Sequence, residues 1–209
     1  MRSRFRRFRN PNTKKLWEKK YNSYIERDYI RSDTTHLLKF MHLFKGSGSI
    51  LDFGSGLGGN VQYLAGRLEK TRFTLLDLSE TSLDFAREKL LGTSDDKGNT
   101  FEFCSTLDEV ADGSFGLVMS IEVLEHISDY KGLLDQLWGK LRPGGTLLLS
   151  VPVLGIRDRT RVHVNKFTLK SMFQILTHYN EIVHIAPRTY SKSSGHLSTA
   201  YFYIEKPEV

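Results

Sequence analysis

One stretch, from Ile50 to Asn60, constrains the fold of this chain more than any other, because an apolar run passes through an acid into a cluster of glycines. Apolar residues at helical spacing follow it, which predicts a strand, a tight loop and a helix. Glycine has no Cβ, so such a loop can adopt positive φ and lie directly against a ligand. The N–H groups at the start of the helix can then hydrogen-bond a polar group. We therefore expect a nucleotide-type cofactor at this loop.

Two cofactor patterns fit these glycines. Gly54, Gly56 and Gly59 satisfy the dinucleotide fingerprint. Asp52, followed by glycines at 54, 56 and 58, satisfies the acid-x-Gly-x-Gly-x-Gly pattern of S-adenosylmethionine enzymes. A third interpretation is a tight turn in an α/β domain with no ligand. The loop alone leaves the three open.

Size and composition predict a globular domain. The chain has 209 residues, of which 39% are hydrophobic and 26% charged, enough for a full doubly wound sheet. No apolar run is long enough to cross a bilayer, and no signal-peptide pattern begins the chain. The single cysteine, Cys104, excludes an internal disulfide and a multi-cysteine metal site. These features together favour a cytoplasmic protein.

The net charge of +6 is concentrated at the N-terminus. Residues 1–20 hold nine Lys or Arg and one acid, whereas the rest of the chain holds 21 bases and 23 acids. We expect residues 1–12 to be a basic, flexible arm and residues 13–209 to be one domain. The arm is interpreted as a solvated tail, with docking to RNA, anionic lipid or an acidic partner through residues 2–9 as the alternative.

The remaining pattern alternates strands with helices. Apolar runs predict strands at 50–53, 72–77, 100–104, 115–120, 145–151, 182–185 and 197–204. Helical patterns lie between them, at 79–91, 133–141 and 168–179, and two more occupy residues 13–46. This order predicts a Rossmann-like, doubly wound, mostly parallel seven-stranded sheet with helices on both faces. Trp17, Tyr21 and Tyr24 share one face of the first helix, which is expected to act as a lid or simply to pack.

The acid Asp77 follows the second predicted strand. Ligands of a doubly wound sheet bind at the carboxyl ends of its strands, and Asp77 lies 18 residues after Gly59. That spacing suits a carboxylate that accepts hydrogen bonds from two ribose hydroxyls. The alternative is a carboxylate that caps the next helix.

Four segments resemble, in order and spacing, the successive motifs of class I S-adenosylmethionine-dependent methyltransferases that act on small molecules. They begin at Ile50, Leu75, Phe115 and Leu141 and span about half of the chain, to Val151. The Val-Leu-Glu-His sequence at 123–126 and the Arg-Pro-Gly-Gly sequence at 142–145 have no place in the dinucleotide fingerprint. The resemblance therefore favours a methyltransferase over a dehydrogenase.

The resemblance implies S-adenosylmethionine as the cofactor, held by residues at the strand ends. The loop and Asp52 would cradle its methionine and ribose portions, Asp77 the ribose hydroxyls, and Ser105 or a backbone group the adenine amino group. The full set of expected cofactor-binding residues is Asp52, Gly54, Ser55, Gly56, Gly58, Asp77, Leu78, Ser105, Ser120 and Ile121.

Two histidines are candidate general bases, and a loop-ordering role is the alternative for each. His126 follows the fourth strand, and His163 lies in an insertion at 152–167, which resembles the His-containing stretch before a helix in many such enzymes. His163 is preferred. The nearby Arg157, Arg159 and Arg161 are expected to attract an anionic acceptor and to disfavour the imidazolium. Neither histidine has partners at metal-ligand spacing in the sequence, so no metal is expected.

The expected function is methyl transfer to a small-molecule or a sugar- or lipid-linked acceptor. Oxygen is preferred as the methylated atom, because Ser120-Ile-Glu-Val stands where amino-methylating nucleic-acid enzymes carry an Asn-Pro-Pro-Tyr type motif. Two alternatives are an RNA or protein methyltransferase docked through the basic arm, and a non-catalytic S-adenosylmethionine-binding partner subunit.

Overall fold

The computed structural model describes residues 11–27, 34–92, 97–189 and 197–208, so residues 1–10 of the expected arm lie outside it. The strands are β1 Ser49–Phe53, β2 Arg72–Leu76, β3 Thr100–Cys104, β4 Phe115–Ile121, β5 Leu141–Pro152, β6 His184–Thr189 and β7 Leu197–Glu205. The α-helices are α1 Lys14–Glu26, α2 Met41–Phe44, α3 Gly59–Ala65, α4 Glu80–Leu91, α5 Tyr130–Lys140 and α6 Leu169–Leu176. Short 3₁₀ helices are η1 Thr34–Phe40, η2 Leu107–Glu109, η3 Leu124–His126 and η4 Gly155–Arg157.

The seven strands form one mixed sheet in the order β3-β2-β1-β4-β5-β7-β6, which confirms the predicted fold class. The first five strands pair in parallel, and β7 inserts antiparallel between β5 and β6. The strand order reverses between β1 and β4, so their carboxyl ends open the crevice in which such sheets bind ligands. The glycine loop follows β1 at this point.

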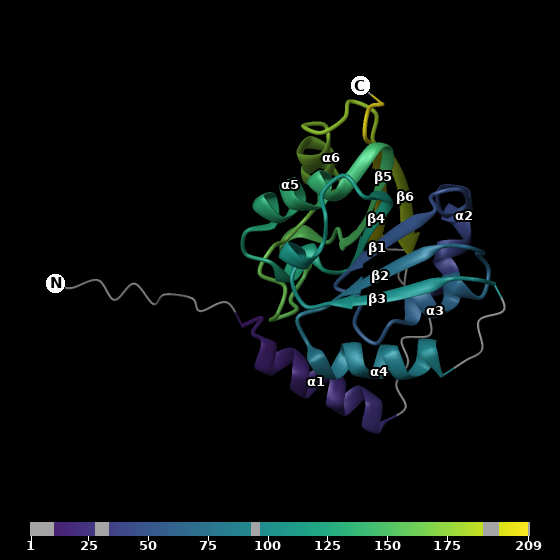
Figure 1. Ribbon diagram of the computed structural model, residues 1–209. Helices are drawn as coiled ribbons and strands as arrows, with labels where there is room; N and C mark the ends of the chain where they lie inside the picture. The colour runs from purple at the N-terminus through teal and green to yellow at the C-terminus, as the bar shows by residue number, and fades with distance from the viewer. Residues whose placement is uncertain (1–10, 28–33, 93–96, 190–196, 209) are drawn as a thin grey trace.

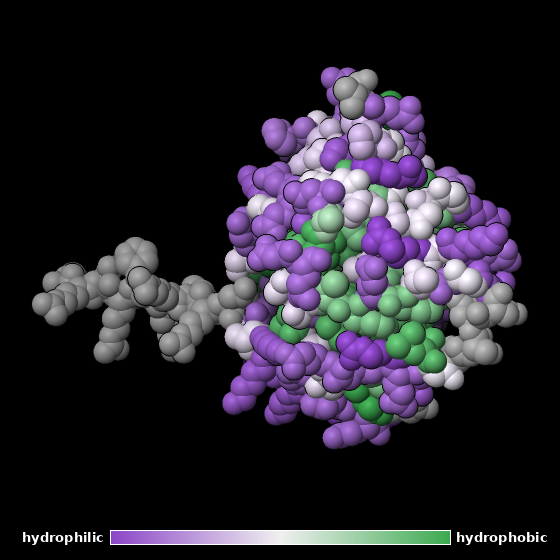
Figure 2. All heavy atoms as spheres, in the orientation of Figure 1, coloured by the Kyte–Doolittle hydropathy of each residue, from purple (hydrophilic) through white to green (hydrophobic). Residues whose placement is uncertain are grey.

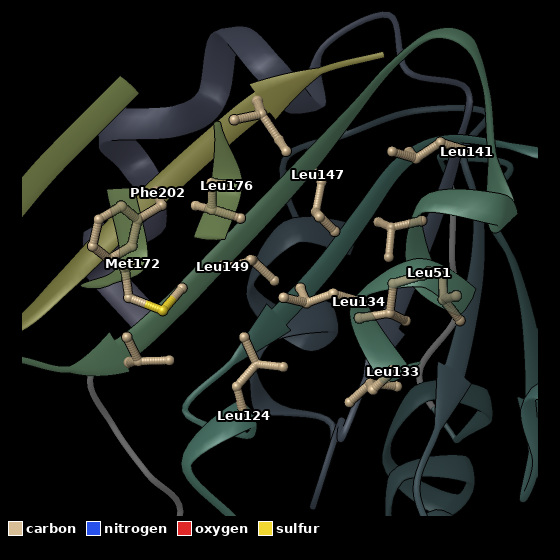
Figure 3. Close-up of a cluster of buried hydrophobic side chains, with 14 of the residues drawn as sticks. Leu51, Leu124, Leu133, Leu134, Leu141, Leu147, Leu149, Met172, Leu176 and Phe202 are labelled. Atoms are coloured by element: carbon tan, nitrogen blue, oxygen red, sulfur yellow. The ribbon is translucent and has the colours of Figure 1, made fainter. Parts of the chain in front are cut away.

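Helices cover both faces of the sheet because successive strand residues point to opposite sides (Figure 1). Leu51 packs with Leu134 of α5 and Met172 of α6 in one buried cluster (Figure 3). Its neighbour Ile50 packs with Leu64 of α3 in a second cluster, which α4 also joins. The near-continuous apolar runs in the sequence therefore match strands that are buried on both faces.

Several element boundaries differ from those expected. Strand β5 begins at Leu141 rather than Gly145, because Leu141 pairs with Phe115 and Thr146 with Leu117 while the Pro-Gly-Gly segment between them loops out of register. Gly144 at its centre has φ of +69°, the left-handed region that glycine favours. Helix α5 begins at Tyr130, three residues earlier than expected, because Asp129 caps it by accepting a hydrogen bond from Gly132 N. Strand β6 begins at His184.

Helix α1 lies beside α4 (Figure 1). The Glu18 carboxylate of α1 accepts hydrogen bonds from the backbone N–H groups of Glu80 (2.9 Å) and Thr81 (3.3 Å) in the first turn of α4. A carboxylate at this position satisfies otherwise unpaired donors and opposes the positive end of the α4 dipole. The anchor fixes α1 over the carboxyl edge of the sheet.

The surface is chiefly hydrophilic at the margin of the view in Figure 2, with apolar atoms gathered toward its centre. Among the described helices, none has the length and apolar character needed to cross a membrane.

Candidate active site

The glycine loop adopts the conformation that its sequence predicts. Gly54, Gly56 and Gly58 all have positive φ, at +75°, +52° and +76°. The N–H groups of Gly54 and Ser55 donate to the carbonyl of Leu76 at 2.7 and 3.0 Å, which ties the loop to the end of β2. A Cβ on Gly56 would lie 3.1 Å from the Tyr21 hydroxyl of α1, so the loop and the helix approach closely there.

Asp77 links the loop, α1 and α4. Its Oδ2 accepts from Gly56 N at 2.9 Å and from the Tyr21 hydroxyl at 3.4 Å, and its Oδ1 accepts from Ser79 N at 2.9 Å. Burial raises the pKa of Asp77, and these hydrogen bonds oppose the rise. The carboxylate therefore holds the N-terminus of α4 through Ser79, as the capping interpretation expects. It also lines the central cavity.

Asp52, at the end of β1, is a buried acid without a hydrogen-bond partner among the described residues. Burial and the nearby Asp77 charge raise its pKa to about 7, and the Asn60 side chain offsets this only in part. The hydroxyls of Ser55 and Ser120 are also buried without partners in the described chain. Buried polar groups nearly always have a hydrogen-bond partner. The buried oxygens of Asp52, Ser55 and Ser120 therefore fit a bound ligand that is polar and positively charged, as S-adenosylmethionine is.

A cavity of about 390 Å³ opens at these strand ends. The lining residues come from α1, the glycine loop, the end of β4 and the insertion after β5. Of the residues expected from the sequence, it brings together Gly54, Ser55, Gly56, Asp77, Leu78, Ile121, His126 and His163. Trp17, Lys20, Tyr21 and Tyr24 of α1 line it as well, so the helix covers the cavity as the lid interpretation expects.

Four other expected cofactor contacts do not line this cavity, and one of them is Asp52, which is buried at the end of β1. Ser105 is exposed at the turn into η2, where its N–H and hydroxyl both donate to Glu109 Oε1 at 3.0 and 3.1 Å. Gly58 caps α3, and a Cβ there would lie 2.8 Å from the Ala86 Cβ, so its glycine serves helix packing. Ser120 is fully buried in β4. Glu109 thus takes both hydrogen-bond donors of Ser105, while the hydroxyl oxygen can still accept a hydrogen bond.

His126 and His163 lie side by side. Their ring centroids are 4.9 Å apart, and the His126 ring also meets Trp17 edge-on at 4.9 Å. His126 Nδ1 lies 3.0 Å from the carbonyl of Val162, which can only accept, so this nitrogen carries the proton. The two candidate bases expected from the sequence are therefore one paired group in the lining of the cavity.

The charged partner of His163 is an acid rather than an arginine. Its Nδ1 lies 2.6 Å from Asp158 Oδ2. The pKa of Asp158 is lowered: burial alone would raise it, but hydrogen bonds from His163 and Thr160 outweigh that effect. The sequence analysis expected arginines to be the charged neighbours of this ring, whereas the structure places the Asp158 carboxylate against it. Arg157, Arg159 and Arg161 are absent from the cavity lining, where Lys20 supplies the one Lys or Arg among the described residues.

Glu125 is a site residue that the sequence analysis did not single out. It is buried, lines the cavity and has a carboxylate oxygen 3.9 Å from His126 Nε2. Glu122 also lines the cavity and has a φ of +58°, which is rare for a residue with a side chain and typical of functional sites. The spacing Glu-x-x-Glu-His was visible in the sequence, but its meaning depends on His163, 37 residues further on.

Known proteins are similar to this chain in sequence. Residues 51–147 match a family model described as a methyltransferase domain. Phosphoethanolamine N-methyltransferase 2 of Caenorhabditis elegans is 27% identical over 146 residues, 70% of this chain and 33% of that protein. Ubiquinone biosynthesis O-methyltransferase of Idiomarina loihiensis is 32% identical over 105 residues, 48% of this chain and 41% of that protein. The chain thus spans less than half the length of these curated relatives.

Solved structures agree on the fold. Phosphoethanolamine N-methyltransferase 2 of Haemonchus contortus, solved with phosphomonomethylethanolamine and S-adenosylhomocysteine, superposes with a TM-score of 0.66 at 19% identity, covering 83% of this chain and 52% of that one. An S-adenosylmethionine-dependent methyltransferase of Aquifex aeolicus gives a TM-score of 0.65 at 17% identity, covering 93% and 98% of the two chains.

Family match, strand order and glycine loop together define the class. Residues 51–147 match a methyltransferase domain, and the strand order and glycine loop are those of the class I S-adenosylmethionine-dependent methyltransferases. S-adenosylmethionine is the cofactor of this class, as the resemblance implied.

Proposed function

We propose that this protein transfers a methyl group to an oxygen of a small-molecule acceptor. The observation that carries the proposal is that the glycine loop with Asp77 and the pair His126 and His163 line one and the same cavity. A cofactor held by the first group and an acceptor held by the second would meet inside this shared cavity. Such alignment of two bound reactants can supply about 7–11 kcal/mol of a barrier.

The residues that would hold the cofactor have distinct tasks. Asp52 and the hydroxyls of Ser55 and Ser120 would interact with the charged methionine portion of the cofactor. Asp77 would accept hydrogen bonds from the ribose hydroxyls, and Leu78 would lie against the adenine. Tyr21 and Trp17 of α1 would close over the bound molecule and exclude water. The bound cofactor supplies a methyl group on a positively charged sulfur, so the leaving group needs no further activation by the protein.

The charge of the cavity favours an uncharged or weakly polar acceptor group over a phosphate. Asp77, Glu122 and Glu125 supply three carboxylates to the lining, against the ammonium of Lys20. A phosphorylated amine, which the name of the Caenorhabditis elegans relative specifies, would need more basic partners than Lys20, which is the one Lys or Arg in the described lining. An oxygen acceptor, as in the name of the Idiomarina loihiensis relative, fits the acidic lining better.

The histidine pair would act on the acceptor hydroxyl. Asp158 holds His163 Nδ1 at 2.6 Å, so Nε2 is the nitrogen that remains to face a substrate. This is the arrangement of a base oriented by a carboxylate. Removing such a group typically costs about 100- to 10,000-fold in rate, less where alignment dominates.

The test measures S-adenosylhomocysteine formation with a set of hydroxyl, carboxylate and amine acceptors. The expected result is methylation at oxygen, reduced at least about tenfold in His163→Gln while S-adenosylmethionine affinity stays within about twofold of wild type. His178→Gln, a substitution of an exposed histidine in the turn after α6 and outside the cavity lining, is the matched control and should leave the rate unchanged. Methylation of phosphoethanolamine nitrogen alone, or a wild-type rate in His163→Gln, would contradict the proposal.

A further inference from the structure

Glu125, His126 and His163 form a group that the methyltransferase assignment does not explain. One carboxylate oxygen and one nitrogen from each ring all lie within 4.8 Å of one another. Glu125 and His126 come from η3 after β4, and His163 comes from the insertion after β5. The first two are buried and the third is half-buried, and all three line the cavity. The fold thus brings together three potential metal ligands that are not spaced in the sequence as metal ligands usually are.

Both rings are oriented in the way that metal-bound histidines are. His126 Nδ1–H donates to the Val162 carbonyl at 3.0 Å, which leaves the lone pair on Nε2. His163 Nδ1–H donates to Asp158 Oδ2 at 2.6 Å, which again leaves the lone pair on Nε2. Metal-ligating histidines almost always donate their second nitrogen to a carbonyl or carboxylate, because this fixes the tautomer and raises ligand basicity.

The backbone around the group is held by a second set of hydrogen bonds. The Asn165 side chain donates to the carbonyls of Leu124 (2.8 Å) and Ile127 (2.6 Å), and its backbone N–H donates to the Glu125 carbonyl at 3.1 Å. The insertion is therefore tied to both ends of η3. A site assembled from two segments requires such a tie, because each ligand must be placed before the ion arrives.

The surrounding charge favours a cation. Glu125 and Asp158 lie in or next to the group, and Glu122 lines the same cavity. The opposing ammonium groups are Lys20, in the lining, and Lys166, whose Nζ is 3.8 Å from Asp158 Oδ1. Two imidazoles and a carboxylate are ligands that first-row transition metals prefer over magnesium and calcium, which favour oxygen alone.

We propose that Glu125, His126 Nε2 and His163 Nε2 bind one divalent first-row transition metal ion, such as zinc or manganese. Ligands bound at about 2.0–2.2 Å would lie closer together than the present atoms, so the side chains must close by on the order of 1 Å. Three protein ligands leave at least one position for water or an acceptor oxygen, which is the arrangement of catalytic rather than structural sites.

The catalytic part of this inference rests on the proposed function. An acceptor hydroxyl bound to the metal would lose its proton more readily, because the ion stabilises the alkoxide. The proton passes to solvent, the oxygen bonds to the methyl carbon, and the cofactor sulfur keeps the electrons of the broken C–S bond as a neutral thioether. The histidines then act on the acceptor through the metal rather than as free bases.

The test is metal binding by full-length, tag-free protein after treatment with EDTA. Calorimetric titration with Zn²⁺ and Mn²⁺ should give one ion per chain, and Co²⁺ should give an absorption spectrum typical of mixed nitrogen and oxygen ligands. Co²⁺ should also quench Trp17, because its ring contacts His126. Trp17→Phe should abolish that quenching and leave the signal of Trp138, so the quenching locates the ion within the chain.

Substitutions separate a site from general binding by surface histidines. His163→Gln and Glu125→Gln should each weaken binding at least about tenfold. Asp158→Asn should weaken it about 10- to 100-fold although it removes no ligand. The new amide would donate to His163 Nδ1 and move the ring proton to Nε2. His178→Gln is the control and should bind as the wild type does.

Two results would overturn the proposal. Loss of stoichiometric binding in the wild type, or equal binding by His163→Gln and His178→Gln, removes the site itself. Full S-adenosylhomocysteine formation by metal-free protein, unchanged on adding the metal, removes its catalytic part. Metal binding is measured without cofactor or acceptor, so it can be tested even if the proposed methyl transfer does not occur. The proposed metal site and the proposed methyl transfer can therefore be refuted independently.

Discussion

Asp52 carries the strongest local conflict in the described structure. It is 1% exposed, its two carboxyl oxygens have no hydrogen-bond partner among the described residues, and its pKa rises to about 7. An acid with such surroundings opposes folding when ionised. A cationic ligand would remove the conflict, so we interpret Asp52 as a group kept for binding rather than for stability.

This conflict predicts a pH dependence. The folded-state pKa of Asp52 lies above its unfolded value, so its contribution to stability is fully present below about pH 4 and is lost as pH rises to about 7. At pH 8 without cofactor, Asp52→Asn should therefore unfold at a higher temperature than wild type. Its free energy of unfolding should be higher by at most about 4 kcal/mol. Near pH 4 the two proteins should unfold alike. Thermal unfolding by circular dichroism at both pH values measures the difference.

Cofactor affinity should change in the opposite sense. Wild-type affinity for S-adenosylmethionine should increase as pH rises through about 7, because the carboxylate must ionise to pair with a cation. Asp52→Asn should bind more weakly and without that pH dependence. A variant that is less stable than wild type at pH 8, or that binds the cofactor equally well, would show that Asp52 is a structural residue.

Helix α1 is the element that covers the site, and the Glu18 side chain is one of the groups that hold it there. Glu18 accepts two backbone hydrogen bonds at the start of α4, whereas the Lys14–Glu80 ion pair beside it is exposed on both sides. Exposed ion pairs contribute little, while a cap contributes about 0.5–2 kcal/mol. Of these two contacts, the Glu18 cap therefore contributes more to the stability of the contact between α1 and α4.

Glu18→Ala should loosen α1 without disturbing the sheet. We expect a loss of about 0.5–2 kcal/mol in stability, weaker S-adenosylmethionine binding, and a Trp17 fluorescence spectrum shifted toward that of a solvent-exposed indole. Glu26→Ala, at the exposed end of the same helix, is the control and should change none of these. Unchanged Trp17 emission in Glu18→Ala would mean that other contacts hold the helix.

Sequence reasoning succeeded where a signal was local and failed where it was not. Strand β1, the loop and Asp77 follow from an apolar run and glycines that need positive φ, and the observed angles agree. The β5 boundary was wrong because the Pro-Gly-Gly segment is a turn signal that here sits between two paired parts of one strand. The adenine contact expected at Ser105 or a backbone group stays a prediction, and the sequence did not show that Glu109, four residues on, accepts from Ser105.

At the scale of the whole molecule, topology places the site. The strand order reverses between β1 and β4, so the glycine loop, Asp77 and η3 lie at the same edge of the sheet. The segment after β5 lies at this edge too, because its residues line the same cavity. The pairing of Glu125 and His126 with His163 exists only because both segments lie at this edge. No periodicity or short spacing encodes it, which is why the sequence analysis expected no metal partners.

The central claim is that the cavity between the glycine loop and α1 binds S-adenosylmethionine through Asp77. Calorimetric titration of S-adenosylhomocysteine into the wild type, Asp77→Ala and the surface variant Asp84→Ala tests it most directly. Asp84 is exposed on α4 and pairs with Arg87, so its loss should not affect the site. The account predicts one ligand per chain for wild type and Asp84→Ala, and at least about tenfold weaker binding by Asp77→Ala. Equal binding by all three proteins, or binding of NAD in place of S-adenosylhomocysteine, would contradict it.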